Sequence, residues 1–253
     1  GLCLTDNQLL YLHEPYMFDN TEKGMSRRYK RFAFDTYVKS DRKIFVQTEH
    51  MKEKLLEYVT NRFGRSFENV EVLKPLHYID KDKSLNINND KLILFYPASE
   101  YAHKNVDLAI NAIVETYKQI DLHLYITIDS IDGYYNYPIS FLGKIKYQNV
   151  IEYFNISHAL LFTSERETLG LPLLEALSVN KPAILPHMPY ATEIYGNAAI
   201  YFNDFEVKDI SKSILKLSQN YTEIKIRASE RWRKETIKRV YWADHWKTFV
   251  ENS

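Results

Sequence analysis

From residue 91 onward, short apolar runs alternate with longer stretches of helical spacing, and this alternation limits the fold more than any other feature. The strand-like runs are Leu92–Ala98, Leu122–Thr127, Ile139–Leu142, Ala159–Thr163, Ala183–Pro186 and Ala198–Phe202. The helical stretches between them are Asn105–Gln119, Tyr147–Phe154, Leu171–Ser178 and Val207–Ser218. This order predicts an α/β domain with a Rossmann-like parallel sheet, whose ligands bind at the carboxyl ends of the strands.

The first part of the chain repeats the pattern on a smaller scale. We expect strands and helices, in turn, at Gln8–Leu12, Met25–Lys39, Lys43–Thr48, Glu49–Asn61 and Val70–Leu73. The polar, turn-rich run 79–90 predicts a linker between domains 1–78 and 91–235. Segment 236–253 continues a tail with spaced aromatic residues and is expected to form a helix that returns to the first domain.

The start of the chain has neither an initiator methionine nor the basic region of a signal peptide. We therefore expect a piece of a longer protein that lacks part of its first domain. The chain has 33 basic and 33 acidic residues, so its net charge gives no reason to expect nucleic acid. A single Cys3 suits a reducing compartment, and no apolar run approaches the ~20 residues of a membrane span. These observations predict a cytoplasmic protein.

One segment departs from this neutral balance. Residues 23–43, with the preceding Glu22, hold eight basic residues and three acidic ones. Met25, Tyr29, Phe32 and Thr36 fall along one side of the helix predicted there. The pattern fits peripheral contact with the anionic inner face of a membrane. The alternative is a solvated helix face with a few aromatic residues turned toward the core.

The seven glycines exclude two common nucleotide-binding motifs. They lie at positions 1, 24, 64, 133, 143, 170 and 196, so no G-x-G-x-x-G occurs, and no Gly-Lys-Ser/Thr is present. A phosphate group would therefore have to be held by a helix end and by side chains.

The stretch from His158 to Pro186 has the features of such a helix end. An apolar run gives way to a polar turn over Thr163–Glu167, and Gly170 and Pro172 then introduce an apolar helical stretch. Free backbone N–H groups and the positive end of the helix dipole favour an anion there. Two carboxylates, Glu167 and Glu175, frame the turn. They also have simpler explanations, since Ser164-x-x-Glu167 matches a capping box and a first-turn Glu175 would stabilise the dipole.

A second stretch, FYPASEYAHKNVD over residues 95–107, resembles the first in running from a strand through a loop into a helix. Together the two stretches resemble the nucleotide-sugar domain of the family 4 retaining glycosyltransferases, which have the two-domain GT-B fold. The family's S-x-x-E-G-F-G-L-P-x-x-E-A pattern matches at Ser164, Glu167, Gly170, Leu171, Pro172, Glu175 and Ala176. Its strand-end Φ-L-G resembles 141–143, and its glycan-side turn resembles 189–196.

The resemblance implies a role for each matching residue. Glu175 would bind the ribose hydroxyls and Glu167 the donor sugar, while Lys104 would neutralise the leaving phosphate. His13 would face the donor sugar from the first domain. The remaining donor contacts fall on Ser99, Gly143, Thr168, Leu169, Gly170 and Leu171. The resemblance implies no metal and no cofactor beyond a UDP- or GDP-linked sugar as substrate.

Some positions depart from the family's pattern. Ala98-Ser99 stands where the family has Gly-Arg, which removes one diphosphate contact. The alternatives are replacement by Arg166 or His103, or no replacement. Thr168 replaces a common glycine, which bears on the choice of sugar. Asp80-Lys81-Asp82 matches the D-x-D of metal-dependent sugar transfer, but the neighbouring lysines favour a solvated turn.

The leading hypothesis is therefore transfer of a sugar, with retention of configuration, from a nucleotide diphosphate to a glycan or lipid-linked glycan in cell-surface polysaccharide synthesis. One alternative is a glycoside hydrolase that uses the two glutamates as its catalytic pair. Another is a sugar-nucleotide-binding module, or an inactive truncated transferase.

Overall fold

A computed structural model describes residues 10–12, 25–73 and 91–251, and the chain divides into two compact units. Of the described residues, the first unit holds 10–12, 25–73, 167–169 and 237–251, and the second holds 91–166 and 170–236. Both units contain only parallel strand pairs among the described strands, which confirms the predicted α/β class. The predicted domain limits, including the packing of 236–253, stay predictions.

The first unit is a small three-stranded sheet in the order β1-β2-β3. Its elements are β1 (Leu10–Leu12), α1 (Met25–Lys39), β2 (Ile44–Val46), α2 (Glu49–Phe63) and β3 (Val70–Val72). Thr48 caps α2 by accepting a hydrogen bond from the Met51 N–H at 3.2 Å, and Gly64 ends it in a left-handed conformation, φ 65°. The predicted strands and helices of this unit are confirmed, with shifts of one or two residues at their ends.

The second unit is a six-stranded sheet in the order β6-β5-β4-β7-β8-β9. Its strands are β4 (Leu92–Tyr96), β5 (Leu122–Ile126), β6 (Ile139–Phe141), β7 (Ala159–Leu161), β8 (Ala183–Pro186) and β9 (Ala199–Phe202). The central strands β7 and β8 are buried throughout, which explains why their sequences are continuous apolar runs. All six predicted strands are therefore confirmed.

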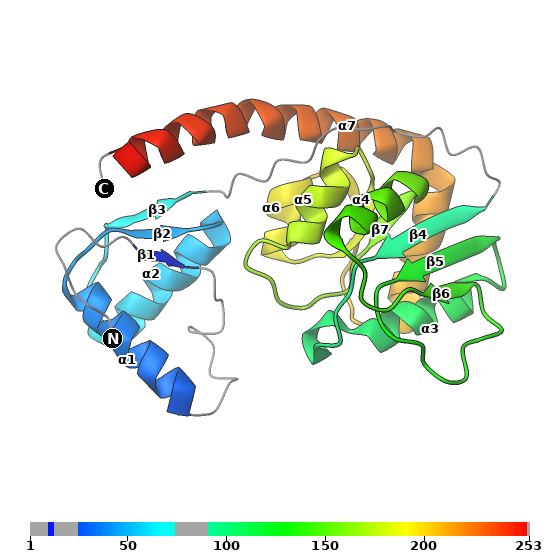
Figure 1. Cartoon of the computed structure of the whole chain (residues 1–253), viewed down its shortest axis with the longest axis horizontal. Coiled ribbons are helices and arrows are strands. Elements are labelled where there is room, and N and C mark those ends of the chain that lie inside the picture. Colours follow the sequence, from blue (N-terminus) through cyan, green and yellow to red (C-terminus); the bar gives the residue numbers. More distant parts are fainter. Residues whose placement is uncertain (1–9, 13–24, 74–90, 252–253) are drawn as a thin grey trace. The chain divides into compact units, whose positions relative to one another are not determined.

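Helices cover both faces of this sheet (Figure 1). They are η2 (Ala102–Lys104, a 3₁₀ turn), α3 (Val106–Thr116), α4 (Tyr147–Ile156), α5 (Leu171–Ser178), α6 (Pro189–Tyr195) and α7 (Val207–Glu251). The Ser211 hydroxyl donates to the Ala112 carbonyl at 3.2 Å, so the start of α7 packs on α3. The long helix is interrupted by non-helical angles at Asn220.

Two local predictions differ from the structure. Segment 189–196 was expected to be a turn, but Pro189 starts the short helix α6, since proline fits a first helical turn. The predicted helix at Asn105 instead begins at Val106, because Asn105 adopts a left-handed φ of 50° that separates η2 from α3. Across the described residues, no helix combines the length and the apolar character needed to cross a membrane.

Candidate functional site

The order of the sheet singles out the loops that follow β4 and β7. From β4 the chain moves outward through β5 to β6, then returns to β7 beside β4 and moves outward on the other side. Ligands of parallel α/β sheets bind at such a reversal, beyond the carboxyl ends of the two strands. Ser99 and Lys104 follow β4, whereas Gly170 and Glu175 follow β7. The fold therefore assigns these sequence stretches to the expected ligand-binding edge.

Thr163, at the end of β7, ties the two loops together. Its hydroxyl oxygen lies 2.8 Å from the Lys104 carbonyl and 3.1 Å from the Asn105 carbonyl, so the two acceptors share one proton. The Asn105 side-chain amide donates in return to the Thr163 carbonyl at 3.2 Å. The Tyr96 hydroxyl donates to the Lys104 carbonyl at 2.5 Å. The backbone of Lys104 is thus held from both central strands.

Two further bonds fix the start of the β7–α5 loop. The Glu165 N–H donates to the His103 carbonyl at 2.9 Å, which extends the link to η2. The Tyr190 hydroxyl of α6 donates to the Ser164 carbonyl at 2.5 Å. Thr163 and Ser164 are both fully buried, so the predicted polar turn does not begin until Glu165. Their hydroxyls organise the loop from inside rather than face solvent.

The side chain of Lys104 extends toward β7. Its ammonium lies 5.0 Å from the ring centroid of Phe162, a fully buried residue that follows β7. The ammonium is attracted to the face of the aromatic ring, and this contact directs the half-buried lysine along the carboxyl end of β7. A cation is therefore located at the edge of the sheet where a phosphate is expected.

Glu175 lies in the second turn of α5, since the helix begins at Leu171 and its first turn contains no acidic residue. The prediction that it lies in the first turn is wrong, and with it the explanation through the helix dipole, which acts mainly within that turn. The side chain is 6% exposed. Burial, together with the nearby Glu175 carboxylate and the hydrogen bond to it, raises the pKa of Tyr147 at the start of α4. A buried carboxylate held by a tyrosine hydroxyl can accept further hydroxyl donors.

Gly170 forms the start of α5. It is the residue before the first helical turn and has φ 68° and ψ 70°, a left-handed conformation that favours glycine. Ser164 therefore does not cap this helix, and the capping-box explanation of Ser164 and Glu167 is wrong. The Ser164 hydroxyl donates to the Arg166 carbonyl at 3.3 Å instead. The first N–H groups of α5 follow a residue without a side chain, as a close ligand requires.

Gly143 follows β6, on the outer side of β5, and also has a left-handed conformation with φ 61°. Its N–H donates to the Ile128 carbonyl at 2.9 Å, and a Cβ placed there would lie 3.2 Å from Asp129 Oδ1. Ser99 follows β4 and is half-buried. The structure thus separates Gly143 from Ser99 and Lys104 by one strand of the sheet, β5.

Several predicted site residues stay predictions. His13 and the Asp80-Lys81-Asp82 run lie outside the described residues. Glu167, Thr168 and Leu169 belong to the first compact unit, whereas the residues on either side belong to the second. Glu167 is half-buried and Leu169 is buried. Among the described residues, no group of three or more His, Cys, Asp or Glu side chains is arranged to hold a metal ion.

Three residues of the site were missed by the sequence reasoning, namely Thr163, Tyr96 and Tyr147. The first two sit within or directly after apolar strand runs, and a hydroxyl in such a run is the signal that could have identified them. A buried hydroxyl must find a partner, and here the partners are loop carbonyls. Tyr147 gave no signal of this kind, because its contact with Glu175 joins two helices.

A surface hollow lies elsewhere in the second unit. It is lined by residues 117–121 between α3 and β5, by Leu122 at the start of β5, and by Pro138 just before β6. These residues lie at the amino end of β5, opposite the edge that carries Lys104. The hollow therefore does not belong to the candidate site.

Residues 135–239 match the family model described as "Glycosyl transferases group 1". The O-antigen chain mannosyltransferase RfbU of Salmonella typhimurium is 20% identical over 225 residues, which cover 85% of this chain and 62% of that protein. The serotype-specific mannosyltransferase WbdA of Escherichia coli is 34% identical over 79 residues, which cover 31% of this chain and 10% of that protein. The chain thus spans less than two thirds of the length of either relative.

Solved structures agree with the predicted fold. The pneumococcal O-GlcNAc transferase GtfA, solved with UDP and GlcNAc, superposes with a TM-score of 0.72 at 18% identity. The match covers 96% of this chain and 52% of that protein. At this identity the likeness concerns the fold alone, and the chain has the GT-B type of fold predicted from its sequence.

Proposed function

We propose that this chain carries the donor site of a glycosyltransferase, which moves a sugar from a UDP- or GDP-linked donor to a glycan or lipid-linked glycan with retention of configuration. The observation that carries the proposal is the Thr163 network, which joins the loop of Lys104 to the loop leading into α5. Two loops locked together at the sheet reversal form a preorganised anion site, and preorganisation is what electrostatic catalysis requires.

Lys104 is proposed to act on the leaving group. When the bond between the sugar and the diphosphate breaks, its electron pair remains on the β-phosphate, so negative charge grows there. A lysine ammonium is a compact cation that can stabilise this charge without a metal ion. Because Tyr96 and Thr163 hold the backbone of Lys104, little reorganisation is needed during the reaction.

Glu175 is proposed to bind the nucleoside. Its buried carboxylate can accept hydrogen bonds from two neighbouring ribose hydroxyls, which are charge-assisted and therefore strong. Tyr147 would act as a positioning residue, since its hydroxyl is bonded to the same carboxylate. Glu167 is proposed to accept hydroxyl protons of the donor sugar, and the N–H groups around Leu169–Leu171 to hold the sugar and the diphosphate.

The names of the relatives suggest the process. RfbU is named an O-antigen chain mannosyltransferase, and WbdA a serotype-specific mannosyltransferase. We therefore propose a role in cell-surface polysaccharide synthesis and rank GDP-mannose first among the donors to be tested. GtfA, whose structure contains UDP, supports testing UDP-sugars beside it.

The test is to incubate the full chain with GDP- and UDP-sugars or with simple glycosides, in the presence of glycan acceptors, and to measure release of nucleotide diphosphate. We expect release from one class of nucleotide sugar and no cleavage of the glycosides. Cleavage of glycosides alone would support the two-glutamate hydrolase instead. Binding without turnover in the presence of acceptors would support a sugar-nucleotide-binding module.

A further inference from the structure

The exposed side chains in the described part of α1 are of only two kinds. Among residues 28–39 of this helix, five are exposed, and each is either basic or aromatic: Arg28, Tyr29, Lys30, Phe32 and Lys39. Tyr29 is 62% exposed and Phe32 is 71% exposed, so Phe32 is the most exposed large apolar or aromatic side chain among the described residues. A helix that exposes large aromatic rings between cations needs an explanation beyond solubility.

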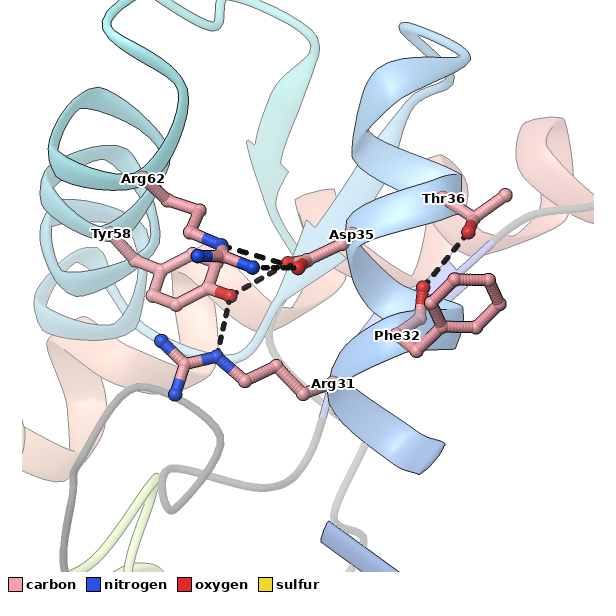
Figure 2. Close-up of polar contacts among 6 residues, drawn as sticks. All are labelled: Arg31, Phe32, Asp35, Thr36, Tyr58 and Arg62. Carbon is pink, nitrogen blue, oxygen red and sulfur yellow. Dashed lines mark hydrogen bonds and ion pairs between the residues drawn. The ribbon is translucent and has the colours of Figure 1, made fainter. Parts of the chain in front are cut away.

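The one acidic residue of α1 does not contribute to this surface. Asp35 is 8% exposed, and its carboxylate accepts a hydrogen bond from the Tyr58 hydroxyl of α2 at 2.6 Å. Arg62 of α2 lies 3.3 Å from the other carboxylate oxygen. Figure 2 shows Asp35 turned toward α2, where Tyr58 and Arg62 surround it. Its negative charge is thus neutralised between the helices, and the exposed side of α1 keeps only positive charge.

The half-buried Arg31 belongs to the same network. Its Nε donates to the Tyr58 hydroxyl at 3.0 Å, and its guanidinium lies 5.2 Å from the centre of the Tyr58 ring. Burial, followed by the hydrogen bond to Asp35, raises the pKa of Tyr58, which keeps its hydroxyl proton available as a donor. The network fixes the rotation of α1 about its axis relative to α2, and therefore fixes which side of α1 faces away from α2.

Phe32 and Thr36 lie on that opposite side. In Figure 2 the Phe32 ring points away from α2 and from the Asp35 network. The Thr36 hydroxyl donates to the Phe32 carbonyl at 2.9 Å, so its hydrogen bond is made within the helix. Tyr29, three positions before Phe32, falls on the same stripe of the helix. The stripe is therefore aromatic, with the exposed Arg28 beside it. Lys39 is also exposed, but its ammonium lies 5.7 Å from the centroid of the Phe63 ring of α2.

We propose that this side of α1 docks on an anionic lipid surface. Aromatic rings insert at the level of the lipid headgroups, while neighbouring arginines and lysines are attracted by the negative charge of the membrane. This side of α1 has both aromatic rings and basic side chains. Because the Asp35 carboxylate is buried against α2, it does not weaken the attraction between the basic side chains and the membrane. The inference concerns the first unit and is independent of the reaction proposed for the second.

A nucleic acid also attracts cations, but it fits this surface less well. Proteins that bind single-stranded nucleic acids stack the bases on aromatic side chains within a basic groove. The aromatic residues of α1 lie instead along the convex surface of a helix. The chain as a whole carries no net charge, whereas nucleic-acid-binding domains are usually strongly basic. The lipid surface accounts for both the rings and the cations.

The test is co-sedimentation of the full chain with vesicles of phosphatidylcholine alone or with about one third phosphatidylglycerol. We expect binding only to the anionic vesicles, with salt-dependent affinity. Arg28→Glu should weaken binding at least ten-fold, since the reversal changes the charge by two and each charge near the surface contributes roughly five-fold. Tyr29→Ser/Phe32→Ser should weaken it about ten-fold by removing the inserted rings. Acidic residues suit the first turns of a helix, so the charge variant should remain folded.

Matched changes elsewhere provide the control. Lys208→Glu reverses one exposed charge at the start of α7, and Tyr135→Ser removes an aromatic residue that is 68% exposed. Both should bind anionic vesicles like the unmodified chain. Equal binding to neutral vesicles, equal losses in α1 and control variants, or displacement of the protein from vesicles by single-stranded RNA at equal phosphate concentration would overturn the proposal. Thermal unfolding of each variant identifies a folding defect. If one of the two α1 variants does not fold, the vesicle binding of the other α1 variant decides the result.

Discussion

The two ends of the strands in the six-stranded sheet use lysine in opposite ways. At the carboxyl ends, the fold holds the backbone of Lys104 through Tyr96 and Thr163 and lets its side chain run past Phe162. At the amino ends, the fold holds the side chain of Lys181 itself. That lysine is 4% exposed, and its ammonium donates to the Asn155 carbonyl at 3.0 Å.

The surroundings of the two lysines differ accordingly. Burial, followed by the charge of Lys225, lowers the pKa of Lys181 to about 8. Its neighbour His158 also has a lowered pKa, first through burial and then through Lys181 and Lys225. The ring Nδ1 of His158 accepts the Ile93 N–H at 2.9 Å, which fixes the neutral tautomer. The amino ends therefore use titratable groups to complete the backbone hydrogen bonding of the fold.

The contrast separates a structural site from a candidate reactive one. A side chain whose polar atoms bond to the backbone is committed to the fold. A residue whose carbonyl is anchored, with a cationic side chain directed along the ligand-binding edge, can serve a ligand instead. The lowered pKa values of Lys181 and His158 lie at the amino ends, so these two shifts reflect structure rather than reaction.

The largest expected effect is on kcat, when each lysine in turn is replaced by an uncharged residue. Lys104→Ala should lower kcat by about 10²–10³, since one preorganised charge donor contributes that much to a transition state. Lys181→Met should leave kcat unchanged. The measurement is nucleotide release at saturating donor. Equal losses in both variants would remove the distinction between the two ends of the sheet.

The second prediction concerns stability, where Lys181→Met should have an effect and Lys104→Ala should not. Lys181 has a folded-state pKa of about 8, below its usual value of 10.5, so the unfolded chain binds more protons between these two pH values. The free energy of unfolding should therefore rise with pH in this window, by up to about 3 kcal/mol from this group alone. Lys181→Met should lose that rise, whereas Lys104→Ala should keep it. Denaturant unfolding at pH 7.5, 9 and 10 measures the difference. Parallel curves for the two variants would show that Lys181 is not buried as described.

The third prediction tests whether Glu175 binds the nucleotide at the carboxyl ends of the strands. Glu175→Ala should weaken binding of the nucleotide diphosphate by about 1.5–3 kcal/mol, the range for hydrogen bonds to charged groups. Glu115→Ala on α3, an exposed residue paired with Lys118, provides the control and should have no effect. Titration calorimetry with UDP and GDP gives both affinities. An unchanged affinity in Glu175→Ala would exclude this residue from the site.

The smallest effect is expected for Thr163→Val, which keeps the shape of the side chain and removes the shared hydroxyl. Loss of one buried hydrogen bond should lower the free energy of unfolding by about 1–2 kcal/mol. It should also reduce kcat more than it raises KM for the donor, because the loop that carries Lys104 loses an anchor. A change in stability alone would make Thr163 a residue of the fold only.

Much of the fold could be predicted from the sequence. The strands of the second unit were located to within about two residues, because buried parallel strands are continuous apolar runs. The helix α6 was missed, since a segment of seven residues that starts with Pro189 and is followed by Gly196 looks like a turn. The position of β7 next to β4 is set by packing, and no local pattern records it.

The candidate site was predicted in part. Motif spacing brought Lys104, Gly170 and Glu175 into one hypothesis, and the fold assigns all three to the loops and helix that follow β4 and β7. The residues that support them were not foreseen, because Thr163 bonds to carbonyls 58 and 59 positions away in sequence. Contacts of this kind depend on the completed sheet.

A donor nucleotide that binds at the carboxyl ends of β4 and β7 can be located by amide hydrogen exchange with and without saturating UDP or GDP. We expect the nucleotide to slow exchange in 98–105 and 163–175, the loops and helix that follow these two strands. Exchange in 117–121 and 179–182, at the amino ends of β5 and β8, should not change. Protection confined to the amino ends, or no protection by either nucleotide at saturating concentration, would show that the nucleotide does not bind between these two loops.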